Sequence, residues 1–289
     1  MLKETKMRTQ FEMEEEIKTR FLAFAMNKAP AHSLKPERFI NKMLKNKGNL
    51  GAFSPDGLDE KGLERRNPII AVLGDSVTAG HFEWLIDPAE LFKGTVEGAT
   101  EASTAPPIIS GPLEVTDVRE VYHERFRLKL IDKYEETSVS VLNAGIAGDD
   151  ILGMERRLSR DVINCQPDLV LINGSLNWPV DLSLSIFEEA LQRIVKRIQA
   201  ETEADIILMT PNAEGSSPFN PNGSTLPERV EIIRRVATEE GTCLCDTYAV
   251  WAEFLEMGYD VTQMLANKIN HPSKAGHEVY AIELMKLFE

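Results

Sequence analysis

Residues 68–76 read Pro-Ile-Ile-Ala-Val-Leu-Gly-Asp-Ser, an apolar run that ends in a turn of small and polar residues. A short, continuous run of this kind is typical of a strand buried on both faces. Similar runs follow at 138–142, 168–172, 205–209 and 242–247. Amphipathic stretches lie between them, near 117–135, 150–162, 184–201 and 226–240. Alternating strands and helices predict right-handed crossovers, and therefore an α/β fold with a parallel sheet covered on both faces.

Two helices are predicted before this pattern begins. Residues 10–27 read as an amphipathic helix with Ile17, Phe21 and Phe24 on one face, and a second short helix begins near Pro36, which suits a first helical turn. Residues 48–66 are rich in Gly, Asp and charge, as linkers are. We expect an N-terminal helical segment and linker over residues 1–66, and the main domain over residues 67–289.

Three further features concern the main domain. Residues 86–116 contain Pro106-Pro107 and fit a long loop inserted after the first strand, and such loops often cover a site. Thr225 and Glu228 have the spacing of a capping box. A final helix, about 273–288, follows His271-Pro272. The loops at 86–116 and 213–225 are expected to set specificity.

The charge balance excludes some classes of partner. The chain of 289 residues has 32 Lys+Arg against 46 Asp+Glu, a formal net charge of −14. Such acidity argues against binding nucleic acid and against docking on an anionic membrane surface. The first twenty residues are charged throughout, so no signal peptide is expected, and no run approaches the roughly 18 apolar residues of a membrane span.

The chain has three cysteines, Cys165, Cys243 and Cys245. An odd number with a Cys-Leu-Cys arrangement is no disulfide framework, and two cysteines with few histidines nearby make a poor zinc site. We expect reduced, mostly buried thiols of a cytoplasmic protein.

Four groups suited to acyl transfer fall where a parallel sheet binds ligands, beyond the carboxyl ends of its strands. Ser76 follows the first strand, Gly148 the second and Asn177 the third, and His271 precedes the last helix. A hydroxyl attacks a carbonyl when a base removes its proton and donors stabilise the oxyanion. A serine, a histidine, a glycine N–H and an asparagine amide supply those parts.

Three blocks resemble the GDSL, or SGNH, hydrolase family. Residues 74–80, Gly-Asp-Ser-Val-Thr-Ala-Gly, resemble its first block, and residues 143–149, Asn-Ala-Gly-Ile-Ala-Gly-Asp, its second. His271-Pro272 with Gly276-His277 is similar to its last. Gly-Asp-Ser alone is a common sequence, whereas the ordered set, each block at a strand end over residues 68–286, is specific.

The resemblance implies a flavodoxin-like three-layer α/β/α domain that hydrolyses small-molecule acyl esters without a metal or cofactor. It implies Ser76 as the nucleophile and His271 as its base, with an acyl-enzyme intermediate. The backbone N–H groups of Ser76 and Gly148 and the Asn177 side chain would form the oxyanion hole. We expect supporting residues in the turns: Asp75 in the first block, and Asn143 and Asp149 in the second.

The chain departs from the family pattern at two places. The third block usually reads Gly-x-Asn-Asp, whereas residues 173–178 read Asn-Gly-Ser-Leu-Asn-Trp, so Asn177 is favoured and Asn173 competes. The acid usually found three residues before the histidine is here Lys268. We hypothesise a Ser–His dyad in which a backbone carbonyl holds the imidazole. The alternative is that Asp246 or Asp260 reaches back to it.

Each candidate also has a structural alternative. Ser76 suits a helix N-cap, Gly148 a tight turn and His271 a loop position, and His277 competes as the base, although packing inside the final helix fits it better. Trp178 fits either the site or the core, whereas Trp84 and Trp251 fit packing. His81 and Glu83 follow the nucleophile and are candidates for shaping a pocket.

The same residues serve functions other than hydrolysis. In an acyltransferase a sugar hydroxyl would replace water at the acyl-enzyme. The missing acid and altered third block would also suit a non-catalytic binding protein that retains the fold. A nucleotide or flavin binder is suggested by fold alone, and the chain lacks a glycine-rich phosphate loop. The sequence leaves the oligomeric state open.

Overall fold

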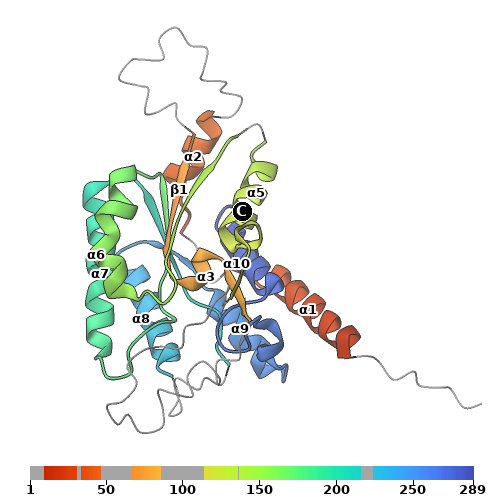
Figure 1. The fold of residues 1–289 in the computed structure, drawn as a ribbon. Helices are drawn as coiled ribbons and strands as arrows, with labels where there is room; N and C mark the ends of the chain where they lie inside the picture. Colours follow the sequence, from red (N-terminus) through yellow and green to blue (C-terminus); the bar gives the residue numbers. More distant parts are fainter. Residues whose placement is uncertain (1–9, 31–33, 47–66, 86–113, 136, 216–223) are drawn as a thin grey trace, which may run out of the picture.

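The structure, a computed structural model, describes residues 10–30, 34–46, 67–85, 114–135, 137–215 and 224–289. A five-stranded sheet with the order β4-β1-β5-β6-β7 forms its centre (Figure 1), and every pair of neighbouring strands is parallel. The five predicted strands are confirmed as β1 (Ile69–Gly74), β4 (Ser140–Gly145), β5 (Leu169–Asn173), β6 (Asp205–Met209) and β7 (Cys243–Cys245).

Helices cover both faces of this sheet (Figure 1). One face packs against α6 (Ile151–Asp161), α7 (Leu184–Glu201) and α8 (Leu226–Glu239). The other packs against α2 (Glu37–Asn46), α5 (Tyr122–Lys133) and α10 (Lys274–Lys286). Side chains of a strand alternate between faces, so Ala71 and Leu73 enter the first core and Ile70 and Val72 the second. The predicted three-layer α/β/α fold is confirmed.

A third apolar cluster joins the N-terminal helix to the C-terminal part of the domain. In α1 (Gln10–Asn27), Phe21 is fully buried, and its ring centroid lies 4.9 Å from that of Trp251 and 4.8 Å from that of Phe254, both in α9 (Thr247–Glu256). The helices predicted over 10–27 and near Pro36 are both present. The linker predicted over 48–66 lies outside the described residues, and the division of the chain at residue 66 stays a prediction.

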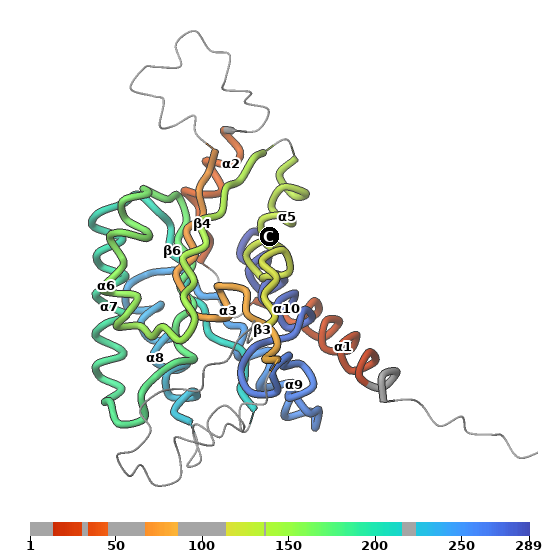
Figure 2. Tube along the Cα trace, in the orientation of Figure 1, coloured from red at the N-terminus to blue at the C-terminus, as the bar shows by residue number. Residues whose placement is uncertain are grey.

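A short hairpin leads from the sheet toward α10. The chain leaves β1 through α3 (Ser76–Ala79) and enters β2 (His81–Trp84), which pairs antiparallel with β3 (Glu114–Thr116) (Figure 2). The ring of Phe82 in β2 packs 4.8 Å from that of His277 in α10. The prediction of a loop over 86–116 is wrong for residues 114–116, which form strand β3 and pair with β2. Residues 86–113 of that prediction lie outside the described residues.

Other details of the prediction need correction. The capping box at Thr225 is wrong, because the Thr225 side chain accepts from Arg229 and makes no bond to a helix N–H. Helix α9 was not predicted, because it follows β7 with a single residue between them. The stretch 117–135 divides into a 3₁₀ turn, Val118–Glu120, and α5. Two further 3₁₀ turns are Ile163–Cys165 and Val261–Met264.

All three cysteines are free thiols, as expected from their spacing. Cys243 and Cys245 are buried, Cys165 is half-buried, and burial raises the pKa of the Cys243 thiol to about 12. Among the helices that the structure describes, none is long and apolar enough to span a membrane.

Candidate active site

Ser76 lies at the carboxyl end of β1, on the first turn of α3. The N-cap of this helix is Asp75, whose Oδ1 accepts from the Val77 N–H at 3.0 Å. The alternative role of Ser76 as the N-cap is therefore wrong, and its hydroxyl is not used for capping. Asp75 is fully buried, and burial raises the pKa of its carboxyl to about 7, against the lowering effect of the Val77 N–H.

Two glycines let α3 pack directly on the strand ends. A Cβ atom added to Gly74 would lie 2.0 Å from Thr78 Oγ1, and one added to Gly145 would lie 2.2 Å from the Ala79 nitrogen. Both distances are far below van der Waals contact, and at Gly145 the obstacle is backbone. The glycines that close β1 and β4 thus fix the position of the turn that carries Ser76.

The structure brings Ser76 and His271 together. Ser76 Oγ lies 3.0 Å from His271 Nε2, and His271 Nδ1 lies 3.1 Å from the carbonyl oxygen of Phe82. A carbonyl oxygen only accepts, so Nδ1 carries the ring hydrogen and Nε2 is left to accept from the serine hydroxyl. Both side chains are buried, Ser76 at 7% exposure and His271 at 3%.

The surroundings keep the His271 ring neutral. Burial lowers the pKa of His271 to about 4, the bond to the Phe82 carbonyl opposes this, and the nearby His81 lowers the pKa slightly further. At neutral pH the ring is therefore unprotonated, and Nε2 is available as a base.

No carboxylate of the described residues lies within hydrogen-bond distance of the His271 ring, and the two aspartates considered from sequence are engaged elsewhere. Asp246 binds Thr210 and Arg234, and Asp260 accepts from Thr262. The alternative in which either aspartate reaches His271 is wrong.

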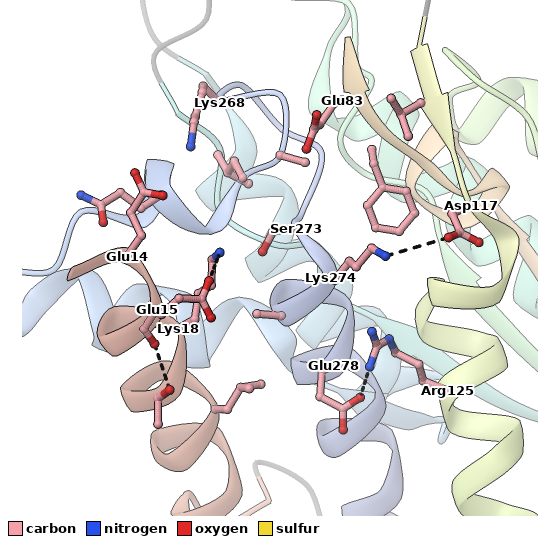
Figure 3. A pocket seen from close by; sticks show the side chains of 18 residues that line it. Glu14, Glu15, Lys18, Glu83, Asp117, Arg125, Lys268, Ser273, Lys274 and Glu278 are labelled. Carbon is pink, nitrogen blue, oxygen red and sulfur yellow. Dashed lines mark hydrogen bonds and ion pairs between the residues drawn. The ribbon is translucent and has the colours of Figure 1, made fainter. Parts of the chain in front are cut away.

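Lys268, at the family's usual acid position, lies on the wall of a cavity of about 700 Å³ (Figure 3). Lys268 is exposed there and has a left-handed backbone, with φ 61°. The cavity lies between α1, α10 and the β2–β3 hairpin, and Phe82 and Ser273 also line it. It therefore borders the segments that flank His271, although neither Ser76 nor His271 lines it.

The loops after β4 and β5 meet at a single hydrogen bond. Asn177 Nδ2 donates to the Asp149 carbonyl at 3.1 Å, which places the amide beside Gly148. Gly148 is exposed and has φ 73°, a left-handed conformation suited to glycine. The amide of Asn177 has a second hydrogen, and no described residue accepts from the Gly148 N–H. Both donors are thus free for a ligand.

The competing asparagine faces the interior. Asn173 is fully buried at the end of β5, next to the hydroxyls of Tyr122 and Tyr280. Burial raises the pKa of both hydroxyls, and hydrogen bonding to the Asn173 side chain opposes this rise. Its amide is therefore directed into the core, whereas Asn177 is half-buried in the loop beyond the strand.

A buried arginine, not foreseen from sequence, holds these loops in place. Arg157 donates to Asp149 Oδ2 at 2.6 Å and to the carbonyls of Ala144, at 2.6 Å, and Gly74, at 2.9 Å. It therefore ties the ends of β1 and β4 to the Gly148 loop. The sequence does contain a signal for this role. Arg157 lies three residues after Met154 in a helical pattern, and this spacing places both side chains on the same, buried face of the helix.

Asn143, the other supporting residue predicted in the second block, lies in β4. Asn143 Oδ1 accepts from the Gly145 N–H at 2.9 Å.

His277 is fully buried in α10, where its Nδ1 accepts from the Tyr122 N–H at 3.2 Å. It contacts α5 in this way, whereas His271 is the histidine that contacts Ser76.

The structure places Trp178 in the core, one of its two predicted locations, and Trp251 packs as predicted. Trp178 is buried against Phe187, with ring centroids 5.4 Å apart, and its indole N–H donates to the Leu182 carbonyl, so it belongs to the core. Trp84, expected only to pack, lies with its ring 6.2 Å from that of His271.

His81, on the same hairpin as Trp84, also lies close to the His271 ring. The two ring centroids are 6.3 Å apart, and His81 pairs across the hairpin with Glu114. Glu83, the other residue predicted to shape a pocket, lines the cavity of Figure 3. Within the ranges that the structure covers, no group of three His, Cys, Asp or Glu side chains could hold a metal ion.

The chain has relatives among known proteins. A model of the GDSL-like lipase/acylhydrolase family matches residues 72–279. An acetylxylan esterase of Geobacillus stearothermophilus is 28% identical over 158 residues, which cover 51% of this chain and 71% of the relative.

Solved structures share the fold. The acetylxylan esterase Axe2 of G. stearothermophilus has a TM-score of 0.54 at 24% identity, over 76% of this chain and 93% of that one. A lipase/acylhydrolase of Enterococcus faecalis has a TM-score of 0.53 at 22% identity, over 76% and 95%. The family match spans β1 to α10 and therefore includes every residue of the site described above. This chain belongs to the GDSL-like lipase/acylhydrolase family and is a carboxylic ester hydrolase.

Proposed function

We propose that this hydrolase removes a small acyl group, such as acetyl, from a carbohydrate or another small molecule, through an acyl-enzyme on Ser76. The observation that carries the proposal is the 3.0 Å contact between Ser76 Oγ and His271 Nε2, at the carboxyl end of a parallel strand. A neutral histidine at this distance is suited to remove the hydroxyl proton as the serine attacks.

The proposed reaction has two halves. Ser76 Oγ attacks the ester carbonyl while His271 Nε2 accepts its proton, and the tetrahedral intermediate collapses as His271 returns that proton to the leaving alcohol. His271 then takes a proton from water, which attacks the acyl-enzyme, and the proton passes to Ser76 as the carboxylic acid leaves. The N–H groups of Ser76 and Gly148 and the Asn177 amide would stabilise both oxyanions.

The Phe82 carbonyl would take the place of the missing acid. Its 3.1 Å bond to Nδ1 favours the tautomer in which Nε2 is the base, and it orients the ring. A carbonyl carries only partial negative charge, so it stabilises the imidazolium less than a carboxylate would. We therefore propose a Ser–His dyad.

The choice of substrate rests on the relatives. The curated relative is an acetylxylan esterase, and the solved structures of Axe2 include catalytic mutants in which a serine and a histidine are replaced by alanine. The ring of Trp84 beside His271 would suit a short acyl chain or a sugar ring, because aromatic faces pack well on apolar surfaces. A cytoplasmic location stays a prediction.

The test uses p-nitrophenyl acetate, butyrate and octanoate with wild type, Ser76→Ala and, as a matched control, Ser185→Ala at an exposed position on α7. We expect turnover to fall with acyl length, to be lost in Ser76→Ala, and to be unchanged in Ser185→Ala. Turnover that survives in Ser76→Ala would overturn the proposal. Product analysis with an added sugar acceptor distinguishes the acyltransferase alternative, which would yield the acylated sugar instead of free acid.

A further inference from the structure

We propose that Asn267 is the positioning residue that holds the backbone of His271 in line with Ser76. The inference rests on the proposed function and adds to it a residue that touches neither substrate nor the reacting atoms. Asn267 lies four residues before His271, next to Lys268, in the loop between Met264 and Ser273.

The Asn267 side chain is the centre of this loop. Its Oδ1 accepts from three successive backbone N–H groups, those of Ile269 at 3.0 Å, Asn270 at 2.9 Å and His271 at 2.8 Å. Its Nδ2 donates to Asn270 Oδ1 at 3.0 Å. Successive N–H groups that converge in this way form a concave site for an oxygen that carries negative charge, and here a side-chain amide of the same loop fills it.

Every polar group of His271 is held by a described partner. The ring nitrogens contact Ser76 and Phe82, and the carbonyl accepts from the Ala266 N–H at 2.8 Å. The N–H donates to Asn267. The partner of the His271 N–H is thus the side chain of Asn267. A substitution at Asn267 therefore leaves the contacts of His271 with Ser76, Phe82 and Ala266 directly unaltered.

The rest of the loop is anchored independently of Asn267. Asn212 Nδ2 donates to the Asn270 carbonyl at 2.9 Å, and the Gly215 N–H donates to the Ile269 carbonyl at 2.6 Å. The Ser273 N–H donates to the Met264 carbonyl at 2.8 Å, which closes the base of the loop. Loss of Asn267 would therefore leave the loop attached to the domain and act mainly on the orientation of His271.

Lys268 gives this arrangement a conformational cost. Its φ of 61° is left-handed, a region that a lysine rarely adopts. The turn at Lys268 directs the next three N–H groups toward Asn267 Oδ1. The three hydrogen bonds compensate for the strained backbone, and without them the segment before His271 would relax.

A small shift at His271 would affect the chemical step more than binding. The Ser76 Oγ to His271 Nε2 distance is 3.0 Å, and a displacement of about 1 Å in a reacting group can cost about 10² in rate. Because Asn267 contacts the backbone N–H of His271 and not its ring, its loss should lower kcat and leave KM nearly unchanged.

The experiment compares four variants: Asn267→Ala, Asn267→Asp, Asn270→Ala as the matched control, and Ser76→Ala. Each is checked for folding by circular dichroism and assayed on p-nitrophenyl acetate for kcat and KM. The rate of labelling of Ser76 by a serine-directed phosphonate is measured in parallel, because it reports the serine's reactivity directly.

We expect Asn267→Ala to lower kcat and the labelling rate together, by about tenfold or more, with KM changed less than about twofold. Asn267→Asp should stay within about threefold of wild type, because a carboxylate accepts the same three N–H groups. Its negative charge should also raise the pKa of His271 and shift the acid limb of kcat/KM upward. Asn270→Ala keeps all three bonds and should stay within about twofold of wild type.

An unchanged kcat and labelling rate in Asn267→Ala, with Ser76→Ala inactive, would overturn this inference and leave the proposed function standing. Turnover that survives in Ser76→Ala would instead overturn the proposed function. Should Asn267→Ala fail to fold, Asn267→Asp decides: a folded Asn267→Asp with kcat reduced more than about tenfold would contradict the inference, since it retains the three acceptor bonds.

Discussion

His271 Nδ1 lies 3.1 Å from the carbonyl oxygen of Phe82, where the family pattern leads one to expect a carboxylate. Phe82 lies in β2, which follows the nucleophile turn after Gly80, so the segment that carries Ser76 also supplies the group that orients its base. The Phe82 ring is held against His277 in α10, and this contact fixes the carbonyl relative to the loop of His271.

The first prediction concerns the acid limb of the activity profile. Because burial lowers the pKa of His271 from 6.5 to about 4, the base stays unprotonated well below neutral pH. We expect the main acid limb of kcat/KM for p-nitrophenyl acetate near pH 4, with activity lost below it as Nε2 is protonated. An acid limb near 6.5 would contradict the buried, neutral imidazole.

Asp75 supplies a control for this profile. Its pKa is raised to about 7, so its titration beside Ser76 predicts a second, shallower change near neutrality. Asp75→Asn should remove that change and leave the limb near pH 4, because an amide oxygen still accepts from the Val77 N–H. The lowered pKa of His271 also affects stability. Between pH 6.5 and 4 the unfolded histidine binds a proton and the folded one does not, so the free energy of unfolding falls as the pH drops through that window.

Restoring the family's acid should not restore a triad. Lys268→Asp is expected to change kcat by less than about twofold, because position 268 is exposed on the cavity wall and Nδ1 already donates to the Phe82 carbonyl. Aspartate also tolerates the left-handed backbone there better than lysine. A rise in kcat of tenfold or more, measured on p-nitrophenyl acetate, would mean that a carboxylate at 268 reaches the imidazole and that the carbonyl is a poor substitute.

The two asparagines of the third block should behave differently. Asn177→Ala is expected to lower kcat by about 10²–10³ with little change in KM, since it removes a donor to the oxyanion. Asn173→Ser, in the core, should lower the midpoint of thermal unfolding and leave kcat of the folded enzyme within about threefold. The reverse pattern would assign the oxyanion donor to Asn173.

Arg157 should be essential to stability as well as to the site. Arg157→Ala leaves the half-buried Asp149 carboxylate and the carbonyls of Gly74 and Ala144 without their donor. Breaking an ion pair of this kind lowers the free energy of unfolding by up to about 3–5 kcal/mol. Arg160→Ala, on the exposed side of the same helix, is the control and should leave the urea midpoint unchanged. Equal midpoints for the two variants would show that Arg157 does not hold the loops.

Much of the fold could be predicted because the sheet is buried on both faces. Its strands then appear as continuous apolar runs, and β1 and β5 are buried along nearly their whole length. Strand-end reasoning placed Ser76 at the carboxyl edge of the sheet. Its pairing with His271, which lies in the loop before α10, was implied by the resemblance of residues 74–80 and His271-Pro272 to the family's blocks. Asn177 was favoured over Asn173 because a residue at the end of an apolar strand should point less freely, and the structure shows Asn173 fully buried.

The remaining features lack a side-chain signature. The acceptor at His271 Nδ1 is a backbone carbonyl, which every residue possesses, so no sequence pattern distinguishes Phe82. Strand β3 has only three residues and pairs with β2 across a long intervening segment.

The prediction of a capping box was wrong because of the local backbone. Thr225 has φ −88° and ψ 21°, not the extended backbone of a capping residue, and its hydroxyl oxygen accepts from the Arg229 guanidinium.

The most direct test of the central claim is to identify, by mass spectrometry, the residue that a serine-directed fluorophosphonate modifies in wild type and in His271→Ala. The Ser76–His271 dyad predicts a single adduct on the peptide that contains Ser76, formed at least about tenfold more slowly in His271→Ala. An adduct on another serine, or labelling of Ser76 at the same rate without His271, would contradict it.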